Sequence, residues 1–153
     1  MDLITEYNRL INQGYLQSDK SQEIAISQLY MLGSQFMSSQ QKKKANGQFF
    51  WPFRQIQIKS LKPQNKGLYM FGGVGTGKSM LMDLFFESID NSRKIRVHFH
   101  AFMYEFHKKM RKIRPSQRKN PVRTACQEIL KDISLLCFDE FQVVDITDAM
   151  IIG

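Results

Sequence analysis

The sequence predicts an α/β fold in which helices flank a parallel β-sheet. Three short apolar runs have the length and composition of buried strands, and they lie at residues 67–71, 95–100 and 134–138. Helical patterns separate these runs, and strands that alternate with helices in this way form parallel sheets. A glycine-rich stretch at 71–79 follows the first run and predicts a loop with unusual backbone freedom.

The N-terminal residues, 1–40, are predicted to form a helical segment. Apolar residues within 2–13 share one face of a short helix, and Gly14 stands just past its end. A second helix is expected to start near Ser18–Asp19 and to run to about Met37, because apolar residues recur at three- and four-residue steps.

Residues 41–65 are predicted to form a basic and aromatic linker or insert. The polar run at 38–48 lacks periodicity and is expected to be a loop. The string FFWPF at 49–53 follows it. These aromatic side chains either fold back onto the core or form an exposed anchor for a membrane or a protein partner.

Four further helices are predicted between and after the three strands. SMLMDLFFESI, at 79–89, is apolar almost all round, which is typical of a helix buried against a sheet. AFMYEFHKKMRKI, at 101–113, has an apolar stripe opposite its lysines and arginines. Asn120–Pro121 has the residues of a helix start, and Asp145 is suited to cap a last short helix, ITDAMII.

The chain carries 22 Lys and Arg against 14 Asp and Glu, a net charge of +8. This balance favours an anionic partner such as phosphate ligands, nucleic acid or an acidic membrane surface. The charge gathers at 41–47 and 107–120, where solvated helix faces and linkers are the more common interpretation. No apolar stretch approaches the roughly 18 residues of a membrane span, and MDLITEYNRL lacks the features of a secretory signal, so a cytoplasmic protein is expected. Cys126 and Cys137 are predicted to be buried, reduced thiols.

Residues 72–79 fit G-x-x-x-x-G-K-[ST], the pattern of a phosphate-binding loop or Walker A motif. Such a loop wraps backbone N–H groups around phosphates, which requires partly positive φ angles and no Cβ atoms in the way. The following helix adds its positive dipole end. Lys78 brings a charge to the β- and γ-phosphates, and Ser79 offers a hydroxyl to Mg²⁺. The predicted ATP-binding residues are Gly72, Gly73, Val74, Gly75, Thr76, Gly77, Lys78 and Ser79; a glycine-rich turn with an accidental lysine is the alternative.

The string LLCFDE supplies the second half of such a site, a Walker B pattern. An acid at the carboxyl end of a buried strand points into the crevice where α/β sheets bind ligands. Asp139 is predicted to hold Mg²⁺ together with Ser79, and Glu140 to orient and deprotonate the attacking water. Glu140 and Lys78 are thus the predicted catalytic residues, and a helix-capping pair of acids is the alternative for 139–140.

His98 and His100 alternate within the predicted strand and are expected to face one side of it. A pair of histidines without carboxylate or cysteine support is weak evidence for a metal site. A structural role, or modest coupling to the phosphate site, is the favoured interpretation.

The strings KGLYMFGGVGTGKSMLMDLFF, RVHFHAFM and LLCFDEFQVVDITDAM closely resemble the ZapE-type cell-division ATPases. These are bacterial relatives of the mitochondrial lactation-elevated ATPase, within the AAA+ superfamily. The resemblance is strong over 66–153 and looser around Asp19 and Gln22. It implies that 66–153 is the N-terminal part of a P-loop AAA+ domain, with phosphate and Mg²⁺ at Lys78 and Ser79, and Walker B acids at Asp139 and Glu140. It also implies an oligomeric, Mg²⁺-dependent ATPase that remodels or regulates protein partners in cell division or protein quality control.

An AAA+ core has further parts after the Walker B strand, so the resemblance implies a sheet truncated after its third core strand. In the AAA+ strand order, 5-1-4-3-2, the fourth strand separates 67–71 from 134–138. A sheet without that strand leaves backbone groups unpaired, which is costly. The expectation is therefore the N-terminal piece of a longer ATPase, which alone binds nucleotide weakly at best.

Two other classes of function remain open from the sequence. A P-loop kinase places its first and third strands side by side, and it would transfer phosphate to an acceptor. A non-catalytic fragment would bind nucleotide only, or dock a partner or the inner membrane peripherally through its basic runs and FFWPF. No specific nucleic-acid partner is expected.

Overall fold

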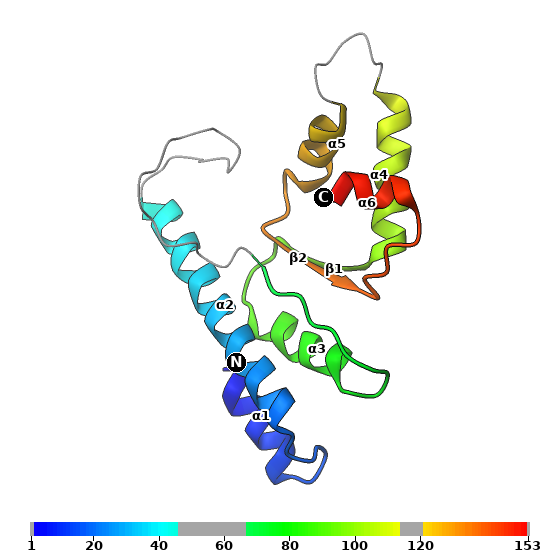
Figure 1. Ribbon diagram of the computed structural model, residues 1–153. Helices are drawn as coiled ribbons and strands as arrows, with labels where there is room; N and C mark the ends of the chain where they lie inside the picture. The colour runs from blue at the N-terminus through cyan, green and yellow to red at the C-terminus, as the bar shows by residue number, and fades with distance from the viewer. Residues whose placement is uncertain (1, 46–66, 114–120, 153) are drawn as a thin grey trace, which may run out of the picture. The chain divides into compact units, whose positions relative to one another are not determined.

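The structure is a computed structural model that describes residues 2–45, 67–113 and 121–152. The chain divides into two compact units, Met1–Asp90 and Asn91–Gly153, and each is described by itself. The first unit contains α1 (Leu3–Asn12), α2 (Lys20–Ala45) and α3 (Lys78–Ser88). The second contains β1 (Lys94–His98), α4 (Phe99–Lys112), α5 (Pro121–Leu130), β2 (Leu135–Asp139) and α6 (Ile146–Ile152). Figure 1 shows these elements along the chain. Within the described residues, none of the helices has the length and apolar character to cross a membrane.

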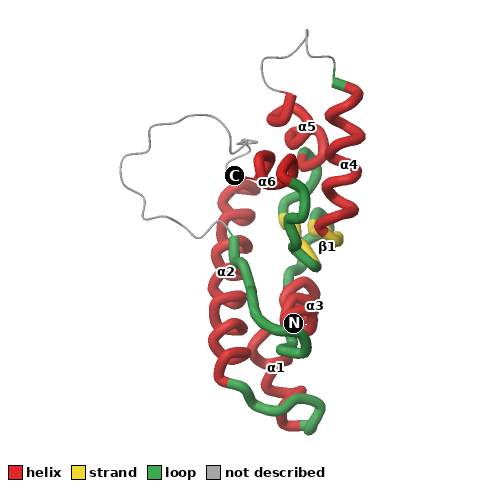
Figure 2. Tube along the Cα trace, turned by 45° about the vertical axis from the view of Figure 1, so that its right-hand side comes forward, coloured by secondary structure: helices red, strands yellow, loops and turns green. Residues whose placement is uncertain are grey.

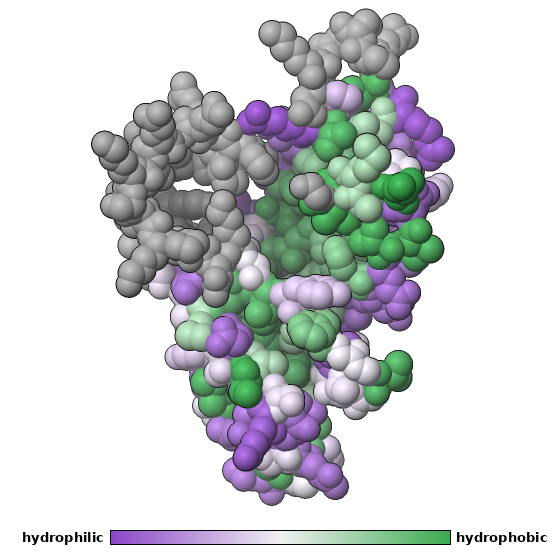
Figure 3. Space-filling model, in the orientation of Figure 1, coloured by the Kyte–Doolittle hydropathy of each residue, from purple (hydrophilic) through white to green (hydrophobic). Residues whose placement is uncertain are grey.

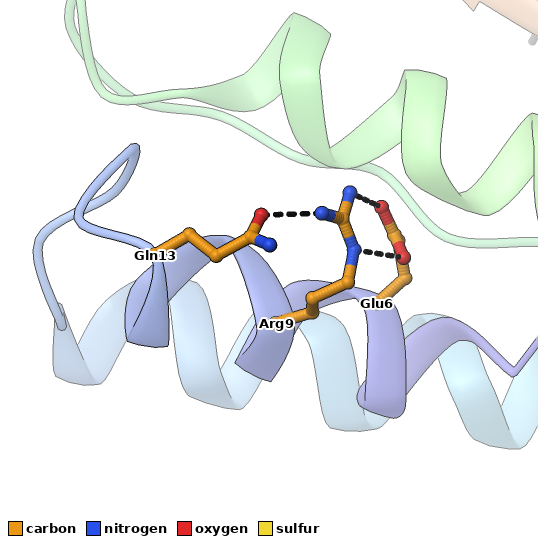
Figure 4. A network of polar contacts seen from close by, with 3 residues as sticks. All are labelled: Glu6, Arg9 and Gln13. Carbon is orange, nitrogen blue, oxygen red and sulfur yellow. Dashed lines mark hydrogen bonds and ion pairs between the residues drawn. The ribbon is translucent and has the colours of Figure 1, made fainter.

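The first helix, α1, is specified by local signals at both ends. Asp2 is its N-cap and accepts hydrogen bonds from the Thr5 amide at 3.0 Å and the Thr5 hydroxyl at 2.7 Å. Along the helix, the Arg9 guanidinium contacts the Glu6 carboxylate through two nitrogens, with Nε at 2.9 Å, and also contacts the amide oxygen of Gln13 (Figure 4). Gly14 follows in the left-handed conformation, with φ 76°. The predicted first helix is confirmed.

The described core of the first unit lies between α1, α2 and α3, which pack against one another (Figures 1 and 2). Its buried apolar side chains are Leu3, Tyr7, Ile26, Leu29, Leu81, Met82, Leu84, Phe85 and Ile89. The sequence predicted that α3 is buried against a sheet. In the described part of this unit, α3 packs against α1 and α2 instead, and these contacts bury its broad apolar surface.

Gly33 allows α2 and α3 to approach closely. A Cβ atom there would lie 3.1 Å from Ile89 Cδ1 and 3.3 Å from Phe85 Cε2. We therefore expect Gly33→Leu to lower the free energy of unfolding by about 1–3 kcal/mol, because the larger side chain overpacks this contact. Chemical denaturation followed by circular dichroism measures the change. Ser34→Leu, at the exposed next position of the helix, is the matched control, and equal destabilisation of both variants would contradict the prediction.

The second unit contains a two-stranded parallel sheet. β1 and β2 pair from Lys94 with Leu135 to His98 with Asp139, so their carboxyl ends meet at one edge. The predicted strand at 134–138 is confirmed within one residue. The predicted strand at 95–100 ends earlier, at His98, because Phe99 begins α4 and is 1% exposed.

Aromatic rings pack against one another within the core of the second unit. The ring of Phe99 lies 5.6 Å from that of Phe138 and 4.6 Å from that of Phe141, and Phe102 meets Phe138 edge-on at 5.0 Å. Buried residues of α4 and α5, including Phe106 and Ala125, complete this cluster. These contacts follow the apolar stripe of α4 that the sequence predicted.

The last helix, α6, is attached by polar contacts as well as by packing. The carboxylate of Asp145 accepts a hydrogen bond from the Thr147 amide at 2.8 Å, which agrees with the predicted cap. Asp148 is 8% exposed and contacts His107 of α4 at 2.7 Å. Figure 3 shows hydrophobic side chains on the surface of this unit. The exposed apolar residues of α6 and the loop before it are Val143, Val144, Ile146, Met150 and Ile152.

Two predicted elements differ from the structure. The apolar run at 67–71 is not a strand, and Leu68, Tyr69 and Phe71 are exposed at 41%, 65% and 85%. A strand forms only where a neighbour pairs with its backbone, and neither described strand pairs with this run. The predicted loop at 38–48 is helical as far as Ala45, because glutamine, lysine and alanine are good helix formers. The rest of the linker, including FFWPF, lies outside the described residues.

Candidate functional site

The glycine-rich loop joins an extended segment to the N-terminus of α3. Gly75 and Gly77 have φ angles of 80° and 84°, in the left-handed region that side chains disfavour. A Cβ atom at Gly77 would also lie 2.9 Å from Nε2 of Gln22. The first helical hydrogen bond runs from the Leu81 amide to the Gly77 carbonyl at 2.9 Å, so the three preceding amides have no acceptor within the helix. These two glycines therefore fix a turn that ends in free helical donors.

Lys78 folds its side chain back over the loop. Its ammonium donates to the carbonyls of Gly72 at 3.0 Å and Gly73 at 2.6 Å, and it lies 3.3 Å from the Thr76 hydroxyl. The Thr76 hydroxyl donates to the Gly73 carbonyl at 3.0 Å. The loop thus closes around a positive charge supplied by its own sequence.

This loop has the chemistry to hold a polyphosphate. Its tip is exposed, and among the described residues, chain neighbours aside, no atom lies within 4 Å of a Cβ built at Gly73 or Gly75. The first turn of α3 contains no acidic residue, so the positive end of the helix dipole is not neutralised there. Ser79 lies in the same turn and is exposed. Free amides, an ammonium group and a hydroxyl together match what a phosphate chain and its metal ion require.

The predicted Walker B residues follow the sheet of the second unit. Asp139 is the last residue of β2, and its Oδ2 lies 2.6 Å from Nη2 of Arg96 on β1. Partial burial raises the pKa of Asp139, but the hydrogen bond and charge of Arg96 outweigh it and leave the pKa below its usual value. The carboxylate is therefore ionised at neutral pH, as a metal ligand must be. One such carboxylate suits Mg²⁺, which takes few protein ligands and keeps water and phosphate oxygens.

Glu140 has an unusual backbone conformation, with φ 51°. A non-glycine residue in this region stores strain, and such residues are common at functional sites. Its carboxylate is 70% exposed and lies 3.9 Å from Nδ1 of His98. The prediction that His98 and His100 share a strand face is wrong, because His100 belongs to α4. The described residues contain no group of three or more metal-binding side chains.

The remaining sequence predictions concern thiols and basic runs. Cys137 is buried and Cys126 half-buried, and burial raises the pKa of both free thiols. In the described part of the run at 107–120, Lys108 pairs with Glu105 at 3.2 Å and Lys109 with Glu128 at 3.7 Å. These pairs agree with a solvated helix face.

The family model of the AFG1-like ATPases matches residues 1–153, the whole chain. The chain belongs to the AFG1-like ATPase family. Cell division protein ZapE of Escherichia coli K12 is 34% identical over 152 residues, which cover 97% of this chain and 40% of ZapE. Lactation elevated protein 1 homolog B of Danio rerio is 46% identical over 106 residues, which cover 63% of this chain and 21% of that protein. No solved structure matched the chain. The predicted resemblance to ZapE-type ATPases is confirmed, and the chain spans less than half the length of either relative.

In this AFG1-like ATPase, the predicted site residues fall into two sets. Gly72 to Ser79 lie in the first unit, and Asp139 and Glu140 lie in the second. The sequence did not predict that Gln22 contacts the loop or that Arg96 contacts Asp139. Arg96 lies two residues before His98 on β1, and side chains two residues apart on a strand share a face. This alternation is the sequence signal that could have placed Arg96 near the site.

Proposed function

We propose that this AFG1-like ATPase binds ATP with Mg²⁺ at residues 72–79 and hydrolyses it with the acids at 139 and 140. Family membership is the observation that carries the proposal. The loop supports it, because its left-handed glycines, the amides ahead of the first helical bond and the Lys78 ammonium together suit a triphosphate.

Each residue has a distinct proposed task. Lys78 leaves the carbonyls of its own loop and neutralises charge on the β- and γ-phosphates. The Ser79 hydroxyl and the Asp139 carboxylate would hold Mg²⁺, and the bound ion would neutralise phosphate charge. Glu140 accepts a proton from the attacking water. Arg96 contacts Oδ2 of Asp139, and its charge keeps the carboxylate ionised, as it would have to be to hold the metal ion.

The wider role is proposed from the relatives. One of them is named a cell division protein, so we propose an AAA+ ATPase that works on protein partners in division or in quality control. We further propose that the protein forms an oligomer in the cytoplasm. A peripheral position at the inner membrane is the alternative location, which the basic runs suggest.

ATP turnover by the chain tests the proposed reaction. Inorganic phosphate is expected to appear in solution when Mg²⁺ is present, and chelation with EDTA should reduce its release to background. Binding of a fluorescent ATP analogue should weaken on chelation but persist, because the loop amides and Lys78 still contact the phosphates. Labelled phosphate on an acceptor, rather than in solution, would instead identify a kinase. Failure to bind the analogue would overturn the proposal.

A further inference from the structure

A chain of hydrogen bonds links the N-terminal helices to the phosphate-binding loop within the first unit. Nε2 of Gln22, in the first turn of α2, donates to the Thr76 carbonyl at 3.3 Å. Oε1 of the same side chain accepts from the Tyr7 hydroxyl of α1 at 3.3 Å. Gln22 is the side chain that joins a buried tyrosine to the backbone of the loop.

The position and orientation of Gln22 are both fixed by neighbours. Asp19 accepts hydrogen bonds from the amides of Ser21 at 2.7 Å and Gln22 at 3.0 Å, which fixes the first turn of α2. Tyr7 is 2% exposed. Burial, followed by the charges of Glu23 and Asp19, raises the pKa of Tyr7, so its hydroxyl stays protonated and remains a donor. Since Tyr7 takes the carbonyl end of the amide, the NH₂ end of Gln22 faces the loop.

The geometry of the peptide bond means that this contact also fixes the direction of the Gly77 N–H. In a trans peptide, the C=O and the following N–H point in opposite directions. A hydrogen bond that holds the Thr76 carbonyl towards Gln22 therefore turns the Gly77 N–H to the other side. Gly77 is the residue with φ 84° directly before α3, and a Cβ atom there would clash with Gln22 Nε2 at 2.9 Å. The glutamine thus contacts the peptide on which the turn depends.

We propose that Gln22 is a positioning residue that presents the Gly77 N–H to a phosphate, and that the α1–α2 segment thereby belongs to the nucleotide site. This inference rests on the proposed nucleotide binding by residues 72–79. It assigns a role in binding to a segment that the Walker motifs do not include. Without this hydrogen bond, the plane of the Thr76–Gly77 peptide is no longer held in one orientation. ATP binding should then weaken about five- to tenfold.

The test compares Gln22→Met with wild type in the full chain. Methionine keeps the length and volume of glutamine but neither donates to Thr76 nor accepts from Tyr7. Gln35→Met is the matched control, because Gln35 is exposed on the same helix. The dissociation constant of a fluorescent ATP analogue is one readout. The second is the amide ¹⁵N resonance of Gly77 without nucleotide, which reports hydrogen bonding to the carbonyl of its own peptide.

We expect Gln22→Met to weaken binding and to shift the Gly77 resonance, and Gln35→Met to do neither. Tyr7→Phe keeps the amide but releases its orientation, so a smaller effect on both readouts is expected; this variant decides the question if Gln22→Met does not fold. A wild-type chain that binds the analogue, with both readouts unchanged in the variants, would overturn the role of Gln22 and leave the proposed function intact. A wild-type chain that fails to bind would overturn both.

Discussion

Alanine in place of Lys78 is expected to weaken ATP binding by about 100-fold or more. A charged hydrogen bond to phosphate contributes roughly 1.5–3 kcal/mol, and Lys78 is proposed to contact two phosphates. Its ammonium is already placed over the loop by the carbonyls of Gly72 and Gly73, at 3.0 Å and 2.6 Å. Isothermal titration calorimetry with a non-hydrolysable ATP analogue measures the loss.

Two further variants separate charge at the site from general effects of charge. Lys20→Ala removes an exposed lysine from the same unit, and it should leave the dissociation constant within about twofold of wild type. Lys78→Arg keeps the charge but enlarges the head group, so binding should recover only in part. Equal affinity of Lys78→Ala and wild type would contradict the assignment of this loop.

Local sequence was sufficient to predict the shape of the loop. Positive φ angles were expected from the glycine spacing, and Gly75 and Gly77 have them. The reason is physical: few other residues adopt this conformation, so a cluster of glycines is direct evidence for it. The helix start at Asp145 was equally local, because this cap accepts its hydrogen bond from an amide only two residues further on.

Two predictions of secondary structure failed, each for its own physical reason. An apolar run such as 67–71 has the composition of a strand, but only a paired neighbour makes it one. The absence of periodicity in 38–48 predicts a loop, but the chain is helical as far as Ala45. Periodicity reports which face of a helix is buried, however, and a polar helix such as the end of α2 has none.

Contacts between site residues and their partners also had no local signal. Gln22 and Thr76 are 54 residues apart, and Arg96 and Asp139 are 43 apart. The motifs identified which residues carry phosphate and metal chemistry. They did not indicate which side chains hold those residues in place, because packing between elements decides that.

Glutamine in place of Glu140 is expected to lower ATP turnover by about 10²–10³-fold and to leave ATP affinity nearly unchanged. The amide keeps the size of the side chain but accepts a proton far less readily than a carboxylate. Phosphate release and analogue binding, measured on the same protein sample, test the two parts. Glu87→Gln, at an exposed position of α3, should turn over ATP like wild type. A Glu140→Gln protein with normal turnover would remove Glu140 from the proposed mechanism.

The backbone of Glu140 allows strain and chemistry to be separated. Glu140→Ala and Glu140→Gly both lack the carboxylate, so both should lose turnover to the same extent. Only glycine is relaxed at φ 51°, so Glu140→Gly should unfold with a free energy about 1 kcal/mol higher than Glu140→Ala. Urea denaturation of the two variants measures this difference. Higher stability of Glu140→Gly would show that the positive φ at this position costs stability, a cost that the fold bears to hold the acid there. Equal stability of the two variants would show that the turn at Glu140 carries no such cost.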